Sequence, residues 1–199
     1  MRRKTFAEKI GVRQLVTVAA AAAVSFILML LQINLPIAPD FIKFDLSDIP
    51  ALIMSFTFGP ITGILTALLK NLIHLFITST GGIGELSNFL LSCAFVVPAG
   101  IIYKRKKTRS QALIAMLIGT ICLAITGMLS NYYIMFPFYS KFMPLDKIIE
   151  MCREIVPFID SKLKVILFSV TPVNLIKGFA ISVITFLIYK RLSPIIKGK

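Results

Sequence analysis

Tryptophan is absent from this chain of 199 residues, and it has only three cysteines and one histidine. No CxxC motif and no suitably spaced histidine accompanies Cys93, Cys122 or Cys152. This scarcity argues against both a disulfide framework and a zinc site. Without tryptophan, the five tyrosines remain as the aromatic side chains that typically mark a membrane–water interface.

Charged residues are also scarce, at 16%, whereas soluble domains average about 25%. Hydrophobic residues make up 57% of the chain, and its mean hydropathy is +0.87. These values indicate an integral membrane protein embedded in the lipid bilayer. Apolar segments take up most of the sequence, so we expect an all-α transmembrane bundle that forms a single domain over residues 1–199.

Acidic residues number nine against 22 basic ones, and the net charge of +13 would suit a nucleic-acid-binding protein. The distribution of this charge contradicts that interpretation. Fourteen basic residues and one acidic residue lie in three short segments beside apolar stretches, at 2–13, 104–109 and 190–199, and the rest of the chain is balanced. This is the positive-inside pattern, which predicts that all three segments are cytoplasmic. There they can also contact anionic lipid.

Hydropathy predicts six membrane spans, at about 14–35, 48–59, 61–78, 85–103, 112–136 and 166–189. Six crossings with both termini cytoplasmic put every basic segment on one side. The apolar run at 15–31 is too long for a signal peptide and is expected to be a retained helix. The second span contains only about ten residues before Gly59 and Pro60, where ~20 are typical. Short segments interrupted by glycine and proline at membrane depth tend to line cavities.

The last span carries Asn174 and Lys177 in an otherwise apolar stretch. Thr171 and Pro172 resemble an N-cap and a first helical residue, which predicts that the helix begins there. The three-residue spacing then places Asn174 and Lys177 on one face. An ammonium group that faces lipid costs at least ~3 kcal/mol, so such a lysine usually faces a cavity and marks a function. The alternative is a lysine that extends to the membrane surface.

Other polar residues are predicted near the outer ends of the spans. Lys70 and His74 share a helical face, and His74 is interpreted as orienting Lys70. Glu85 and Asn88 open the fourth span on one face, although Glu85 can equally serve only to stabilise a helix N-terminus. Asp48 is interpreted as a cap of the short second helix. The segment 137–164 is expected to form a short amphipathic helix over the outer face, with Ile148, Met151, Cys152 and Ile155 at helical spacing.

The polar residues of the outer halves therefore predict a pocket that opens away from the cell. Its polar members are Lys43, Asp45, Asp48, Glu85, Asn88, Asn131, Asn174 and Lys177, with Phe41, Phe44, Tyr132 and Phe136 as aromatic companions. Amides suit a ligand with alternating donors and acceptors, and aromatic side chains suit a flat ring. The sequence contains no HExxH, GxSxG or Walker A motif. Binding is therefore a better interpretation than catalysis.

Five stretches occur in an order that makes the interpretation specific: FDLSDIPALI at 44–53, FGP at 58–60, KNLIH at 70–74, TSTGGIGELSN at 78–88 and NLIKG at 174–178. Together with six spans, they resemble the riboflavin-binding S components of energy-coupling factor (ECF) vitamin transporters. The resemblance covers most of the chain. It implies a multi-pass protein of the bacterial plasma membrane that captures riboflavin from outside and docks on a T subunit with two ATPase subunits.

The resemblance also implies roles for individual residues. Asn131, Asn174 and Lys177 are expected to bind the pyrimidine edge of the flavin ring, which offers an N–H group between two carbonyls. Lys43, Asp45, Glu85 and Asn88 are expected near the ribityl hydroxyls. Ala19 and Ala23 fit the family's alanine-rich docking face, although composition alone would equally allow the alanine run at 19–23 to pack within the bundle.

Three alternatives remain open from the sequence. One is an S component for another vitamin, since a shared scaffold can change specificity through its loops. Another is a membrane-embedded enzyme that uses Lys70, His74 and Glu85 for acid–base chemistry. The third is a purely structural bundle, which would bind no small molecule.

Overall fold

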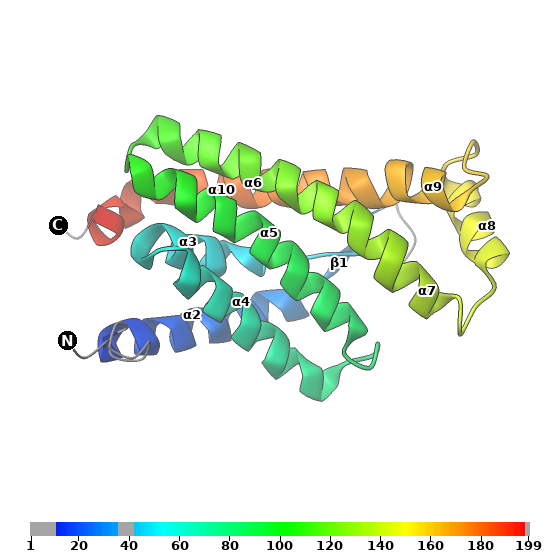
Figure 1. Cartoon of the computed structure of the whole chain (residues 1–199), viewed down its shortest axis with the longest axis horizontal. Coiled ribbons are helices and arrows are strands. Elements are labelled where there is room, and N and C mark those ends of the chain that lie inside the picture. The colour runs from blue at the N-terminus through cyan, green and yellow to red at the C-terminus, as the bar shows by residue number, and fades with distance from the viewer. Residues whose placement is uncertain (1–10, 36–41, 198–199) are drawn as a thin grey trace, which may run out of the picture.

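The computed structural model describes residues 11–35 and 42–197, and side chains as far as Ile188 (Figure 1). Helix α2 (Val12–Leu30) is followed by a two-stranded antiparallel hairpin of β1 (Ile33–Asn34) and β2 (Lys43–Phe44). Helices α3 (Asp48–Phe58), α4 (Pro60–His74), α5 (Ile83–Arg105) and α6 (Arg109–Ser130) come next. Short helices α7 (Phe136–Tyr139), α8 (Leu145–Ile155) and α9 (Lys162–Val165) precede the last helix, α10 (Thr171–Lys197).

Within the described residues, five helical stretches are long and apolar enough to cross a membrane: Val12–Leu30, Pro60–Ile77, Ile83–Arg105, Arg109–Tyr139 and Lys162–Ile188. They correspond to five of the six predicted spans, and the chain is a multi-pass membrane protein. The remaining predicted span, 48–59, is α3, which has only 11 residues. The arrangement of six crossings stays a prediction.

Helix α3 lies at the centre of the bundle. It packs against α2, α4, α5 and α10, and eight of its 11 residues are buried. After α3 the chain turns back on itself at Gly59, and Pro60 then begins α4. The φ of Gly59 is 108°, in a region that glycine adopts without strain. Because α3 is so short, the chain before it reaches the interior of the bundle as a loop that carries Asp45 and Ser47.

Among the described residues, the hydrophobic core has two parts. The larger part surrounds α3, α5 and α6 and includes Leu52, Phe95 and Leu123. The smaller part joins α7, α8 and α9, where Ile148 and Cys152 of α8 are buried against Phe136. The predicted amphipathic helix is confirmed as α8, but Met151 and Ile155 lie on its exposed side, at 36% and 38% exposure. Figure 1 shows the start of α2, the α5–α6 connection and the end of α10 at one end of the bundle, opposite α7–α9.

The prediction that a helix begins at Thr171 is wrong. Helix α9 continues into α10 through a π-helical turn at Ile166–Val170, so Thr171 lies inside a longer helix. Pro172 has no backbone N–H group to donate to the preceding turn. The wider π-helical turn before it is closed by Thr171, whose backbone N–H donates to the Ile166 carbonyl. The Thr171 hydroxyl donates to the same carbonyl at 2.8 Å. A second π-helical turn, Asn131–Met135, joins α6 to α7, so this span extends beyond the predicted end at 136.

Candidate functional site

A cavity of about 390 Å³ lies between the β-hairpin, the α4–α5 connection, α5, the two π-helical turns and α10. This volume falls within the range of small-molecule sites, roughly 300–1,000 Å³. All seven residues predicted to bind the ligand line this cavity: Lys43, Asp45, Glu85, Asn88, Asn131, Asn174 and Lys177. The structure therefore brings together polar side chains from segments more than 130 residues apart.

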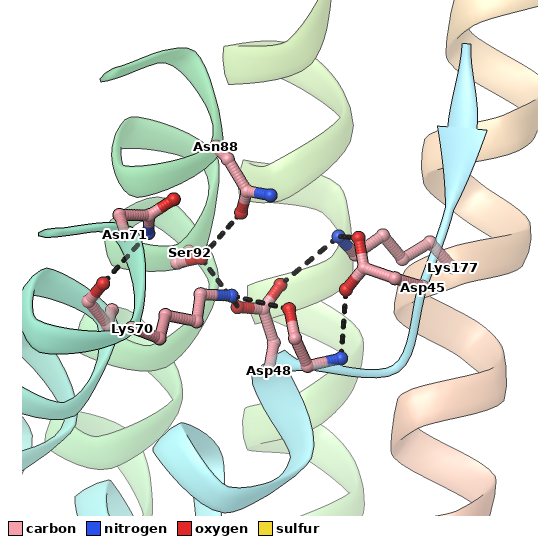
Figure 2. Close-up of polar contacts among 9 residues, drawn as sticks. Asp45, Asp48, Lys70, Asn71, Asn88, Ser92 and Lys177 are labelled. Atoms are coloured by element: carbon pink, nitrogen blue, oxygen red, sulfur yellow. Dashed lines mark hydrogen bonds and ion pairs between the residues drawn. The ribbon is translucent and has the colours of Figure 1, made fainter. Parts of the chain in front are cut away.

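The wall formed by Lys177 and Asp45 belongs to a buried network of charges (Figure 2). Lys177 Nζ donates to Asp45 Oδ2 at 2.9 Å and lies 3.6 Å from Asp48 Oδ2. Asp48 Oδ1 in turn accepts bonds from Lys70 Nζ and Ser92 Oγ, each at 2.5 Å. The two ammonium groups and two carboxylates balance each other, and all four side chains are at most 7% exposed. A buried charge is tolerated only with such partners.

The network stabilises the ionised form of Asp45. Burial alone would raise the pKa of its carboxyl group, but attraction from Lys177, and then from Lys70, holds the pKa below its ordinary value. The backbone N–H of Ser47 also donates to Asp45 Oδ1 at 2.8 Å. Asp45 is therefore ionised at neutral pH, and it fixes the position of the Lys177 ammonium.

A second polar group forms the opposite corner of the cavity. Glu85 Oε1 forms a hydrogen bond with His74 Nδ1 at 2.7 Å, and Glu85 Oε2 accepts bonds from the Thr78 and Thr80 hydroxyls at 2.9 and 3.2 Å. Glu85 lies in the first turn of α5 and also lines the cavity, so its position is compatible with both interpretations of this residue. Three donors on one carboxylate hold the α4–α5 connection against both helices.

The amide side chains are held less tightly. Asn131 Nδ2 donates to the Gly127 carbonyl at 2.9 Å, which leaves its carbonyl oxygen for a ligand. Asn174 packs against Gly127, where a Cβ atom would lie 2.2 Å from Asn174 Nδ2. Asn88 accepts a bond from Ser92 at 3.3 Å. These amides present donors and acceptors to the cavity from three different helical segments.

Two roles proposed from the sequence are wrong. His74 pairs with Glu85 and does not orient Lys70, which is bound instead by Asp48 and Ser47. Asp48 is not a helix cap, because its carboxylate is taken up by Lys70 and Ser92, and the start of α3 shows no side-chain cap bond. The local pattern matched a cap, but the long-range ion pair decides where the carboxylate lies.

The aromatic residues predicted to line the pocket differ from the one found on the cavity wall. Tyr132, Phe136 and Phe44 do not line the cavity, and Phe136 is buried in the smaller core. Phe41 lies outside the described residues. Among the described residues, the cavity wall contains the aromatic ring of Tyr139, in α7. No periodicity in the sequence could place it there, because the π-helical turn before α7 changes which face its residues present.

Several further lining residues have little sequence signal, since they are apolar or small: Met29, Ile42, Ser79, Gly84, Leu91, Met135 and Val170. Gln32, just after α2, adds an amide side chain to the wall that no sequence pattern indicated. Across the described residues, no three His, Cys, Asp or Glu side chains gather closely enough to hold a metal ion. The arrangement can bind an uncharged polar molecule of moderate size through hydrogen bonds.

Comparison with known proteins gives the same architecture. Residues 13–189 match the family model for the substrate-specific component of ECF transporters. The chain is 33% identical to the riboflavin transporter RibU of Staphylococcus aureus, over 93% of each chain. It is 31% identical to the riboflavin transporter FmnP of Bacillus subtilis, over 92% of this chain and 93% of that one.

Solved structures agree with these relatives. A structure of the S component of a bacterial ECF transporter superposes with a TM-score of 0.72 at 31% identity, over 91% of this chain and 95% of that one. ThiT from Listeria monocytogenes shares the fold, with a TM-score of 0.64 at 15% identity, over 92% and 96% of the two chains. The chain therefore belongs to the family of substrate-specific components of ECF transporters.

Proposed function

We propose that this chain is the riboflavin-binding subunit of an ECF transporter, which captures riboflavin from outside and delivers it through a T subunit with two ATPase subunits. The observation that carries the proposal is the cavity of about 390 Å³, whose wall contains all seven predicted ligand residues. Support for riboflavin rather than another vitamin comes from the relatives at 31% and 33% identity, which are riboflavin transporters.

The chemistry of the wall supports a flavin. Asn131, Asn174 and Lys177 can match the carbonyls and N–H group at the pyrimidine edge of the ring. Leu91 and Val170 offer apolar contact to the flat part of the ring system. Lys43, Asp45, Glu85 and Asn88 are left for the ribityl hydroxyls. Leaving such buried groups unpaired would cost ~1–3 kcal/mol each, which disfavours vitamins with a different pattern of donors and acceptors.

Binding without catalysis is part of the proposal. The three residues considered for acid–base chemistry divide into two groups, since Lys70 pairs with Asp48 while His74 pairs with Glu85. Lys70 does not line the cavity. The energy for transport is proposed to come from the ATPase subunits, because this sequence has no Walker A motif.

The proposed orientation places both termini and the basic segments in the cytoplasm. Figure 1 supports it, because the start of α2, the α5–α6 connection and the end of α10 lie at one end of the bundle. Lys104, Arg105 and Arg109 belong to that connection and its adjoining helix ends. The cavity is lined by residues of the α4–α5 connection and α7. In the proposed orientation it therefore belongs to the outer half of the bundle, and we propose that it opens to the outside.

The experiment that tests the ligand is a titration of the detergent-purified, ligand-free protein with riboflavin while flavin fluorescence is followed. We expect saturable quenching near one flavin per chain. Asn174→Ala or Lys177→Ala should weaken binding by about tenfold or more, since each removes a buried hydrogen-bond partner worth ~1–3 kcal/mol. Lys147→Ala is a matched control, because Lys147 is exposed on α8 and does not line the cavity.

The outcomes separate the alternatives. No quenching by correctly folded protein would reject riboflavin as the ligand, and a screen of other vitamins would then test the same cavity. Binding that is unaffected by either cavity variant would keep the ligand but reject the assigned site.

A further inference from the structure

Lys70 is a fully buried lysine that is not among the proposed ligand contacts. It lies in α4, is 0% exposed, and does not line the cavity. Its ammonium group donates to Asp48 Oδ1 at 2.5 Å and to Ser47 Oγ at 2.7 Å. A buried lysine is costly, so its retention inside a membrane protein needs a physical reason.

Asp48 stands between Lys70 and the cavity lysine. One carboxylate oxygen is bound by Lys70 and Ser92, and the other lies 3.6 Å from Lys177 Nζ, beyond hydrogen-bond distance. Lys177 instead makes its short contact, 2.9 Å, with Asp45 on the cavity wall. Lys177 therefore lies closer to Asp45, which lines the cavity, than to Asp48. Figure 2 shows Lys70 and Lys177 approaching Asp48 from opposite sides.

Ser47 links the two carboxylates through the chain. Its hydroxyl accepts the bond from Lys70, while its backbone N–H donates to Asp45 Oδ1 at 2.8 Å. Lys70 thus reaches both acidic partners of Lys177, one through a direct ion pair and the other through Ser47. Among the described residues around the cavity, the remaining charged or titratable groups are Lys43, His74, Glu85 and Tyr139. Glu85 is already engaged by His74 and two threonines.

We propose that Lys70 is a positioning residue for ligand binding, because it balances the charge of Asp48 and so leaves the Lys177 ammonium directed into the cavity. This inference rests on the proposed function and extends it to a residue that touches no ligand. Without Lys70, two carboxylates would share one ammonium group. Asp48 would then draw Lys177 from 3.6 Å into a direct bond and away from the cavity.

The test compares Lys70→Met with Lys70→Met/Asp48→Asn, using riboflavin titration and thermal unfolding of the full chain in detergent. The single variant should bind riboflavin about tenfold or more weakly than the wild type, since a ligand-facing donor is lost. The double variant is electrically neutral again, so it should recover affinity to within about threefold of the wild type. A role for Lys70 in packing alone would give no such recovery, because its packing is lost in both variants.

A matched control comes from the exposed ion pair between Asp160 and Lys164, whose side chains are 56% and 40% exposed. Lys164→Met and Lys164→Met/Asp160→Asn should both bind riboflavin as the wild type does, because surface pairs contribute little and this one lies away from the cavity.

The inference is overturned if Lys70→Met binds riboflavin normally, or if the folded double variant binds as weakly as the single one. If Lys70→Met does not fold, the double variant decides alone. Folding with near-normal affinity supports a role in balancing Asp48, whereas failure to fold or to bind overturns it. A wild-type protein that does not bind riboflavin would reject the proposed function instead, so the two failures are distinguishable.

Discussion

At the scale of single residues, the cavity depends on space as much as on polar groups. Gly127 in α6 has no side chain, and the Asn174 amide occupies the volume that a Cβ atom would fill. The same helix contains Gly119, which packs against Phe95 in the core and lines no part of the cavity. The two glycines differ in what a methyl group would meet: the end of a flexible side chain at Gly127 and a backbone oxygen at Gly119.

Gly127→Ala should therefore lower riboflavin affinity more than it lowers the stability of the fold. The new methyl group would lie 2.2 Å from Asn174 Nδ2, so the amide must turn away and lose its place opposite the ligand. We expect riboflavin affinity to fall about tenfold with little change in Tm. Gly119→Ala is the matched control. Its methyl group would lie 2.8 Å from the Phe95 carbonyl oxygen, which should lower Tm and leave affinity unchanged. The reverse pattern would contradict the role given to Asn174.

Single residues also show which contacts could be predicted from the sequence. The positions of Asn174 and Lys177 on one helical face follow from their spacing, and both line the cavity as expected. The partner of Lys177 could not be found this way, because Asp45 is 132 residues away and the pair depends on how helices pack. Asp48 was misassigned for the same reason, since a local capping rule says nothing about a lysine 22 residues later.

At the scale of helices, long apolar segments were predictable because the thickness of a bilayer dictates their length. Their internal irregularities were not. A threonine–proline pair is typical of a helix start, yet here it follows a π-helical turn inside a longer helix. The same kind of turn at Asn131–Met135 brings Asn131 and Met135 to the cavity. Both turns thus lie at the site, where the helices depart from regular geometry.

The packing of α8 against α7 and α9 can be tested through Cys152, which is fully buried on the inner face of α8. Burial raises the pKa of the Cys152 thiol to about 11. In a Cys93→Ala/Cys122→Ala background, alkylation by iodoacetamide at pH 8 should be slow, since only about one thousandth of the thiol would be ionised. The rate should rise about tenfold per pH unit toward 11 and become fast at pH 8 in unfolded protein. Equal rates for folded and unfolded protein would mean that α8 does not dock as described.

At the scale of the whole molecule, the helices differ in how much of their surface the chain itself covers. Only 22% of the apolar window of α2 is buried, compared with 44% for Arg109–Tyr139. Ala19 and Ala23 are exposed on α2, while Ala22 faces the bundle. A small-residue face with so little internal cover allows close approach by another helix, as docking on a T subunit would require.

Ala19→Trp tests this docking face. The large side chain should block approach of the partner helix, so co-purification with the T and ATPase subunits and riboflavin uptake by cells should both be lost. Riboflavin binding by the isolated subunit should not change, because Ala19 does not line the cavity. Leu117→Trp, at a 63% exposed position of α6, should affect none of the three measurements. Normal uptake by the Ala19 variant would reject the docking assignment.

The ion pair between Asp45 and Lys177 also bears on how the protein is made. Asp45 precedes the second long helix of the chain, whereas Lys177 lies in the last one, 132 residues later. A ribosome must therefore reach Lys177, 132 residues after Asp45, before this ion pair can form. Until α10 is inserted, Asp45 and Asp48 share Lys70 alone. Chains truncated before α10 consequently leave two buried carboxylates with a single ammonium partner, so they lack half of the positive charge that balances this network in the finished bundle.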